Sequence, residues 1–166
     1  MSRKLRHPSS TKTVVFICTA NYYRSRFAEY LFNVLAEQRG LSWRATSRGL
    51  RTWMVNNEGP ISEFTAYRLT ALGVPFDGKR FPIQLSEADL ETADLVIAVK
   101  EAEHRALMQE QFPAWADRIE YWTVDDIDCA TPNQSLSFCE SCIKALVDRL
   151  AAAEHEGRER TGRAAA

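Results

Sequence analysis

The clearest feature of the chain is a pair of short apolar runs rich in β-branched side chains. One covers residues 13–17 (Thr-Val-Val-Phe-Ile) and the other residues 95–99 (Leu-Val-Ile-Ala-Val). A continuous run of this length, without polar alternation, is typical of a strand that is buried on both faces of a sheet. The sequence therefore predicts two central strands, one near the N-terminus and one past the middle of the chain.

Between and after these runs, apolar residues recur every three or four positions, as on one face of an amphipathic helix. Phe27, Leu31 and Leu35 form such a stripe after the first strand, and Gly40 is a stop signal for this helix. A capping-box pattern begins a short helix at Ser86. The remaining predicted elements are strands at residues 43–47 and 119–124, and helices from residue 60 or 62 to 73, at 101–111 and at 136–150.

Strands that alternate with helices predict an α/β fold with right-handed crossovers. We expect a three-layer sandwich in which a four-stranded parallel sheet carries helices on both faces. Residues 12–150 would form this single domain, which is long enough to bury a sizeable core. Residues 1–11 are polar and basic and predict a flexible N-terminal segment. Residues 151–166 lack large apolar side chains, and we expect them to continue the last helix for a turn or two and then fray.

Composition and charge argue against several classes of function. The chain is 45% hydrophobic and 26% charged, and its formal net charge of -1 provides no field that would attract nucleic acid or an anionic membrane. No apolar run has the length to span a bilayer, and no apolar core of a signal peptide follows the basic N-terminus. We therefore expect a cytoplasmic protein whose four cysteines are reduced thiols rather than a disulfide framework.

The candidate chemistry lies directly after the first predicted strand, at Cys18. In open parallel sheets, the binding crevice lies beyond the carboxyl ends of the strands. A loop that ends at a helix N-terminus presents free amide hydrogens and the positive end of the helix dipole, which bind anions and favour a thiolate. Six residues after Cys18, the guanidinium of Arg24 could hold two oxygens of a phosphate that the sulfur attacks.

Two further side chains complete this predicted phosphate-binding loop. Ser25 is placed to donate a hydrogen bond to the sulfur, and Asn21 tolerates the left-handed backbone that a tight anion cradle requires. The pattern predicts nucleophilic catalysis by Cys18, although a strand-end cysteine that only packs in the core would share part of it. The predicted phosphate-binding residues are Thr19, Ala20, Asn21, Tyr22, Tyr23, Arg24 and Ser25.

The loop, which reads Cys-Thr-Ala-Asn-Tyr-Tyr-Arg-Ser over residues 18–25, resembles the C-x-G-N-x-C-R-S loop of the low-molecular-weight protein tyrosine phosphatases. The similarity extends over most of residues 12–150, including the Ser-Arg-Gly turn at residues 47–49 and a late aspartate loop. It implies a four-stranded parallel sheet with helices on both faces. It also implies hydrolysis of phosphotyrosine-like phosphomonoesters through a phosphocysteine intermediate, without a metal or another cofactor.

The chain departs from this family pattern at three positions in and beside the loop. Ala20 replaces a glycine, which is a small change if the residue keeps a negative φ. Tyr23 replaces a second loop cysteine that can protect the nucleophile as a disulfide, and Arg26 stands where proline is common. None of these changes removes the nucleophile, the arginine or the serine.

The resemblance also implies a general acid in an Asp-Pro pair after the fourth strand. The chain reads Val-Asp-Asp-Ile-Asp at residues 124–128, and alignment on the valine places Asp126 at the catalytic aspartate. Asp128 is the alternative candidate for the general acid, because geometry decides which carboxyl group reaches a substrate. The acidic residues in this segment that do not serve as the acid would form a solvated turn. The tyrosines that follow the pair in many relatives are absent, so the candidate aromatic walls are Trp53, Tyr22 and Tyr23.

Two other signals carry no predicted function. Cys139 and Cys142 form a C-x-x-C pair inside a predicted helix, and we interpret them as small apolar residues on one helical face rather than a redox or zinc site. His104 lies on the polar helix after the third strand, and we expect it to face solvent.

The predicted partner is a phosphorylated protein or a small aryl phosphate, and neither nucleic acid nor a membrane. Two alternative functions stay open. An arsenate reductase would need further thiols, which residues 100–112 do not supply, so that Cys129 or the Cys139/Cys142 pair would have to fold close to Cys18. A non-catalytic phosphate-binding or phosphoprotein-binding module would keep the loop and lose turnover, as the missing Asp-Pro pair would allow.

Overall fold

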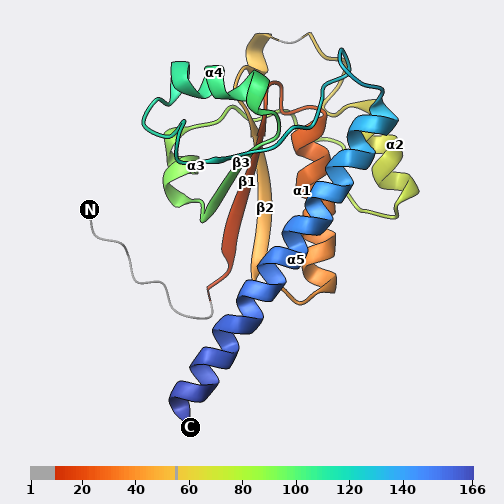
Figure 1. Cartoon of the computed structure of the whole chain (residues 1–166). Coiled ribbons are helices and arrows are strands. Elements are labelled where there is room, and N and C mark those ends of the chain that lie inside the picture. The colour runs from red at the N-terminus through yellow and green to blue at the C-terminus, as the bar shows by residue number, and fades with distance from the viewer. Residues whose placement is uncertain (1–9, 55) are drawn as a thin grey trace.

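The computed structural model describes residues 10–54 and 56–166, so nine residues of the predicted N-terminal segment fall outside it. At its centre is a four-stranded parallel sheet with the strand order β2-β1-β3-β4 (Figure 1). The strands are β1 (Lys12–Cys18), β2 (Trp43–Gly49), β3 (Leu95–Ala98) and β4 (Glu120–Tyr121). This sheet confirms the predicted fold class.

β1 is buried on both faces, which explains its continuous apolar sequence. Val14, Phe16 and Cys18 point into one hydrophobic cluster, whereas Val15 and Ile17 point into the other. Successive side chains of a strand point to opposite faces, so the two layers take alternate residues of the same run. β1 pairs with β2 on one side and with β3 on the other. Its carboxyl end therefore lies where the strand order reverses, the usual place of a binding crevice.

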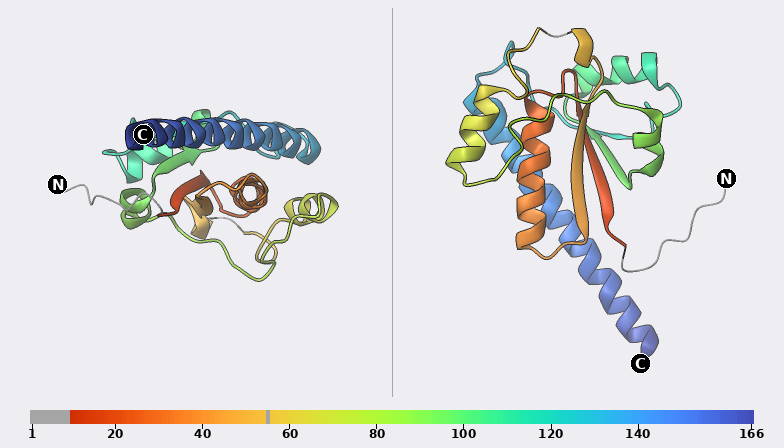
Figure 2. Two further views of the ribbon diagram at one scale, coloured as in Figure 1. Left: turned by 90° about the horizontal axis from the view of Figure 1, so that it is seen from below. Right: turned by 180° about the vertical axis from the view of Figure 1, so that it is seen from behind.

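Helices cover both faces of the sheet. α1 (Arg24–Gln38) and α5 (Pro132–Ala165) pack on one face with α2 (Glu63–Ala71) beside them (Figures 1 and 2). α3 (Glu87–Thr92) and α4 (Glu101–Gln111) cover the other face. A single 3-10 turn, η1 (Thr52–Met54), follows β2.

The predicted bounds of β1, β3 and α4 agree with the structure to within one residue. The other two strands differ from their predicted extent. β2 continues two residues beyond the predicted range to Gly49. β4 is an edge strand in which only Glu120 and Tyr121 pair with β3, so the predicted strand at residues 119–124 was too long.

The last helix is longer at both ends than its apolar stripe indicated. It begins at Pro132 behind a capping box, in which Thr131 accepts a hydrogen bond from the backbone N–H of Gln134, and it runs to Ala165. The helix thus continues well beyond the one or two turns predicted for residues 151–166, and fraying of its end stays a prediction. Alanine, glutamate and arginine are strong helix formers, and i,i+4 pairs such as Glu154 with Arg158 support the extension.

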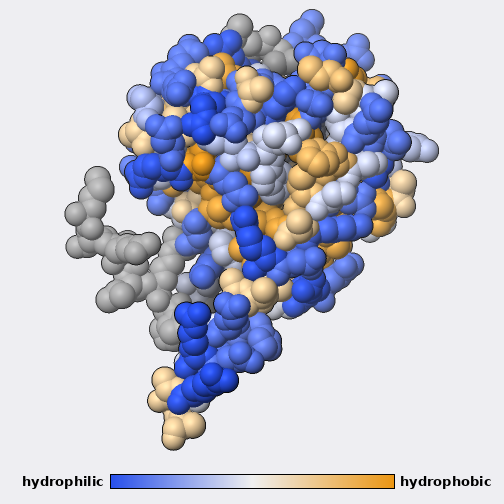
Figure 3. All heavy atoms as spheres, in the orientation of Figure 1, coloured by the Kyte–Doolittle hydropathy of each residue, from blue (hydrophilic) through white to orange (hydrophobic). Residues whose placement is uncertain are grey.

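The C-terminal part of α5 projects beyond the sheet (Figure 1). Residues 155–166 are exposed, and the projecting surface is mainly hydrophilic except for alanines at its tip (Figure 3). Within the described ranges, no helix combines the length and the apolarity that crossing a membrane requires. A domain boundary near residue 150 stays a prediction.

We expect the projecting end of α5 to contribute little to stability. A chain that ends at Glu156 should keep its free energy of unfolding to within about 0.5 kcal/mol, because the removed residues are all exposed. Leu146→Ala, which empties a core position on the same helix, should cost roughly 2–5 kcal/mol. Urea unfolding measures both. A truncation as costly as Leu146→Ala would show that the projecting end takes part in packing.

Candidate active site

The loop between β1 and α1 lies at the carboxyl edge of the sheet, where the sequence predicts the phosphate site. It leaves β1 at Cys18 and enters α1 at Arg24. The backbone N–H groups of Leu50 and Arg51 donate to the carbonyls of Cys18 and Thr19 at 3.0 Å and 2.8 Å. The start of the loop is thus attached to the segment that follows β2.

Two hydrogen-bond donors surround the sulfur of Cys18, a residue that is only 2% exposed. The backbone N–H of Asn21 donates to Sγ at 3.3 Å, and Ser25 Oγ lies 2.9 Å from it. The side-chain amide of Asn21 donates to the same Ser25 oxygen at 2.9 Å, so the hydroxyl hydrogen of Ser25 is free to point at the sulfur. Both donors stabilise negative charge on the sulfur.

Asn21 has a φ of 52°, and it is the one residue besides glycine with a positive φ in the described part of the chain. This confirms the left-handed backbone that the sequence predicts here, and Ala20 has no positive φ. Three bonds hold the Asn21 side chain in place. Its amide nitrogen donates to Ser25 and to Ser47 Oγ at 2.9 Å, and its oxygen accepts from the backbone N–H of Ile83 at 2.9 Å.

Gly49, at the end of β2, lets two chain segments approach closely. It pairs with Cys18 in the parallel register of β1 and β2. A Cβ at this position would lie 2.6 Å from the side chain of Thr52 and 2.9 Å from the carbonyl oxygen of Thr19. Only glycine therefore fits against the start of the loop without displacing it.

Arg24 is a buried cation with several anionic or polar partners. It is 2% exposed, and both oxygens of Glu103 accept hydrogen bonds from its Nη1 and Nη2 atoms at 2.9–3.1 Å. Nη1 also donates to the carbonyl of Val124 at 3.0 Å, and Asp126 Oδ2 lies 3.2 Å from Nη2. Burial alone would lower the pKa of Arg24, but the hydrogen bonds with Glu103 together with the surrounding acidic groups outweigh it and raise this pKa, so the guanidinium stays charged.

His104 and Glu103, both on the first turns of α4, belong to this site. The prediction that His104 faces solvent was wrong: its side chain is fully buried, with Nε2 3.1 Å from Thr19 Oγ1. Burial lowers the pKa of His104 and keeps the ring neutral. Burial would raise the pKa of Glu103, but hydrogen bonds from His104 and Arg24 reverse the shift and hold it well below its ordinary value.

A pocket with a volume of about 320 Å³ opens over the loop. Asp126 lines it together with Cys18, whereas Asp128 is exposed on the same turn and is not part of the lining. Tyr22 and Tyr23 form aromatic walls as predicted, but Trp53 does not line the pocket and is 66% exposed. The other lining residues are Thr19, Ala20, Arg24, Asn57, Ser62, Phe64, Glu103 and Ile127.

Comparison with known proteins identifies this arrangement. A family model described as low molecular weight phosphotyrosine protein phosphatase matches residues 13–133, a range that holds the loop, Glu103 and Asp126. The chain belongs to this phosphatase family. The family that the loop sequence resembles is thereby confirmed.

Two relatives come from Bacillus subtilis (strain 168). Low molecular weight protein-tyrosine-phosphatase YfkJ is 38% identical over 89 residues, which cover 52% of this chain and 55% of the relative. A protein-arginine-phosphatase is 29% identical over 106 residues, or 64% of this chain and 67% of the relative. The crystal structure of YfkJ matches with a TM-score of 0.71 at 26% identity and covers 91% of this chain and 99% of YfkJ. The sequence match with YfkJ thus spans about half of that relative's length.

Two departures from the phosphatase loop now have a structural context. Tyr23, in place of the second loop cysteine, is 8% exposed, and burial raises its pKa to about 12, so it lines the pocket as a neutral phenol. Arg26 is fully buried and donates to the carbonyls of Pro60 and Asp77 at 3.0 Å and 3.3 Å. It therefore ties α1 to the segments that precede and follow α2.

The other three cysteines do not line the pocket of Cys18. Cys139 is fully buried in the core, as the sequence predicts, and burial raises its pKa far above the ordinary value. Cys142 is half-buried on the same helix, and burial raises its pKa too. Cys129 is exposed, 3.5 Å from the amino group of Lys100. No second thiol is thus placed to reduce an oxidised or arsenylated Cys18 within this pocket.

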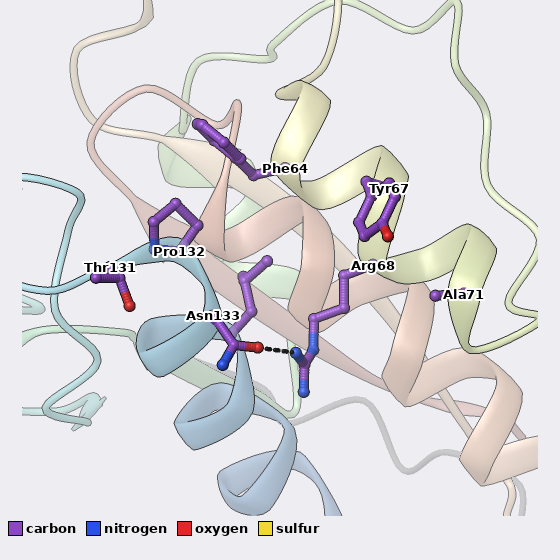
Figure 4. A pocket seen from close by; sticks show the side chains of 8 residues that line it. Phe64, Tyr67, Arg68, Ala71, Thr131, Pro132 and Asn133 are labelled. Atoms are coloured by element: carbon purple, nitrogen blue, oxygen red, sulfur yellow. Dashed lines mark hydrogen bonds between the residues drawn. The ribbon is translucent and has the colours of Figure 1, made fainter.

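An apolar groove lies between α2 and α5 (Figure 4). It has a volume of about 370 Å³, and Arg68 of α2 donates a hydrogen bond to Asn133 of α5 at 3.1 Å. Phe64 lines both this groove and the pocket of Cys18, so the two hollows share one aromatic wall. The other groove residues are Tyr67, Ala71, Thr131, Pro132 and Leu136.

Sequence reasoning missed Glu103, Phe64 and the role of His104. From the sequence, Phe64 is one of the apolar residues that predict α2 and would be taken for a core residue. Only the structure shows that its side chain is 41% exposed. Glu103 carries no local signal, because a glutamate in the first turn of a helix is ordinary. The one available clue was His104, next to Glu103, because both lie at the start of α4, directly after β3, the strand that pairs with β1.

Gly49→Ala tests the close approach beneath the loop. The added methyl group would press on the carbonyl of Thr19, so we expect displacement of the loop and at least a roughly 10-fold loss in hydrolysis of an aryl phosphate. Gly78→Ala is the control, because its Cβ would meet only Phe76 at an ordinary 3.6 Å. Steady-state kinetics compare the two, and equal activities would mean that the loop does not depend on this glycine.

Proposed function

We propose that this protein hydrolyses phosphomonoesters through a phosphocysteine intermediate formed on Cys18. The observation that carries the proposal is the environment of the sulfur. Two donors stabilise its negative charge, it stands at the N-terminus of α1, and the buried guanidinium of Arg24 lies within the same pocket. A nucleophile that is activated in this way next to an anion-binding group is suited to phosphoryl transfer.

In the first step, Cys18 Sγ attacks phosphorus, an S–P bond forms and the P–O bond to the leaving group breaks. Arg24 and the loop amides stabilise the charge on the equatorial oxygens. Asp126, which lines the pocket, gives its proton to the leaving oxygen. Asp126 is preferred over Asp128 because Asp128 is exposed outside the pocket lining.

In the second step, a water molecule attacks the phosphorus of phosphocysteine. Asp126, now a carboxylate, accepts the proton of that water, and the S–P bond breaks to release inorganic phosphate. The electron pair returns to the sulfur, where the hydroxyl of Ser25 and the backbone N–H of Asn21 stabilise the thiolate as a leaving group.

The aromatic walls favour an aryl phosphate, such as phosphotyrosine, as the substrate. Tyr22, Tyr23 and Phe64 line the pocket and would stack on a phenyl ring. One relative is a protein-tyrosine-phosphatase and another a protein-arginine-phosphatase, which makes phosphoarginine the comparison substrate. Hydrolysis of a phosphotyrosine peptide faster than of the matched phosphoarginine peptide would support the aryl class, and the reverse order would overturn it.

We further propose that the natural substrate is a phosphorylated protein rather than a free aryl phosphate. The groove between α2 and α5 shares Phe64 with the catalytic pocket and is lined mainly by apolar side chains. An apolar residue of the substrate chain, next to the phosphorylated one, would fill it.

The four free thiols fit a reducing compartment such as the cytoplasm.

Substitution of the nucleophile and the acid tests the mechanism. Cys18→Ser should abolish hydrolysis of p-nitrophenyl phosphate, whereas Asp126→Asn should lower kcat about 100-fold to 10,000-fold and retain binding of vanadate. Asp128→Asn is the matched control and should keep wild-type kcat. An Asp126→Asn variant with wild-type activity would show that another group is the acid. Vanadate binding without hydrolysis in the wild-type protein would instead favour a binding module.

Tyr67→Ala tests the groove separately from the chemistry. Tyr67 lines the groove but not the catalytic pocket, and it is 80% exposed. We expect KM for a phosphotyrosine peptide with a flanking apolar residue to rise several-fold, relative to KM for p-nitrophenyl phosphate, because contact area is lost. Leu72→Ala, just beyond α2 and outside the groove, is the control. An unchanged ratio of the two KM values would exclude the groove as a substrate contact.

A further inference from the structure

The hydrogen bonds of Arg24 occupy one end of its guanidinium and leave the opposite edge without an acceptor. Nη1 donates to Glu103 Oε2 at 3.1 Å and to the carbonyl of Val124 at 3.0 Å, which uses both of its hydrogens. Nη2 donates to both oxygens of Glu103, at 2.9 Å and 3.1 Å, and both lie at the end of the guanidinium, where its one end-facing hydrogen points. Asp126 Oδ2 lies 3.2 Å from Nη2, as an ion pair without hydrogen-bond geometry. Among the described residues, none accepts a hydrogen bond from Nε. The Nε hydrogen and the second Nη2 hydrogen remain, and these two are parallel donors on one edge of the planar group.

Glu103 is itself held by a chain of hydrogen bonds that begins in α4. The backbone N–H of Lys100 donates to His104 Nδ1 at 3.0 Å, so in the neutral ring the proton lies on Nε2. That nitrogen is 3.1 Å from Thr19 Oγ1 and 3.3 Å from Glu103 Oε1. The Thr19 hydroxyl in turn donates to Glu103 Oε1. Each member fixes the orientation of the next one.

We propose that Glu103, fixed by Thr19 and His104, is a positioning residue for Arg24. Its two oxygens hold the guanidinium from the end, so that Nε and the remaining Nη2 hydrogen are presented to two oxygens of an incoming phosphoryl group. A pre-oriented fork of this kind loses little entropy when the anion binds. The proposal assigns a role in the phosphatase reaction proposed above, but it concerns anion binding and is tested by binding as well as by turnover.

Glu103 could have an alternative role that would weaken anion binding instead of strengthening it. A carboxylate that contacts an arginine in the pocket could compete with the phosphoryl group and would have to move away first. Three observations favour positioning over competition. Glu103 is only 27% exposed, both Thr19 and Arg24 donate to its oxygens while His104 Nε2 lies 3.1 Å from Thr19 Oγ1, and the contact leaves one edge of the guanidinium without an acceptor. Displacement would break all of these bonds at once, at a cost that positioning avoids.

Glu103→Gln distinguishes the two roles. The glutamine amide is a donor and cannot accept from Arg24, so the end-on contact is lost at one of its two points. We expect vanadate to bind about 10-fold to 100-fold more weakly, as measured by titration calorimetry, with a parallel rise in KM for p-nitrophenyl phosphate. Glu101→Gln is the matched control: it lies on the same helix, is exposed and pairs with Arg105 instead. It should bind vanadate as the wild-type protein does.

Two further comparisons show whether Glu103 acts through Arg24. In an Arg24→Lys background the end-on contact cannot form, so Glu103→Gln should change vanadate affinity less than about twofold. Thr19→Val should weaken vanadate binding, whereas Thr19→Ser, which keeps the hydroxyl, should restore it. Thermal unfolding of each variant checks that the fold is intact.

Several results would overturn the positioning role. Tighter vanadate binding in Glu103→Gln would identify a competitor, and unchanged binding would leave Glu103 without a role at this site. An equal loss of affinity with Arg24 intact and in the Arg24→Lys background would indicate a general structural effect. A wild-type protein that binds vanadate and hydrolyses no aryl phosphate would contradict the proposed function alone, whereas one that does not bind vanadate would contradict both.

Discussion

A buried guanidinium is the constraint on which the site depends. Arg24 is 2% exposed, and moving a charge out of water costs several kcal/mol unless charged and polar groups replace the lost hydration. These groups come from separate parts of the chain: α4 supplies Glu103, and the segment after β4 supplies the carbonyl of Val124 and the carboxylate of Asp126. The arginine can therefore be held only when the sheet and its helices have assembled, which makes the proposed anion binding a property of the whole fold.

The backbone of the loop depends on the fold in the same way. Asn21 adopts a left-handed conformation that costs energy for any residue with a side chain, and its bonds with Ser47 and Ile83 offset that cost. Ser47 is within reach because the parallel register places it opposite Phe16, two residues before Cys18. Two positions further along β2, Gly49 leaves room for the loop. β2 thus shapes the site through its register, although none of its atoms takes part in the proposed reaction.

These long-range contacts separate what the sequence could predict from what it could not. Cys18, Arg24 and Ser25 lie within eight consecutive residues between a buried strand and an amphipathic helix, so local pattern was enough to predict the loop and the central strands. Glu103 lies 79 positions from Arg24, on a helix whose polar sequence is typical of a solvated face. Only the adjacency of β1 and β3 brings the start of α4 to the loop, and helical spacing alone does not mark which polar residues then turn inward. The length of α5 was missed for the converse reason, since its second half follows from helix propensity and has no apolar stripe.

The charge balance inside the pocket decides how an anion is recognised. The carboxylate of Glu103 already faces the guanidinium of Arg24 before a substrate arrives, and the carboxyl group of Asp126 lies 3.2 Å from it. The positive charge of Arg24 is therefore largely compensated, and with a net charge of -1 the chain as a whole provides no long-range attraction for a phosphate dianion. Capture must come instead from short, directional hydrogen bonds, which the open edge of the guanidinium and the loop amides supply. Such bonds depend on the positions of individual oxygens, so the arrangement of the donors, more than the overall charge, would decide which anion binds.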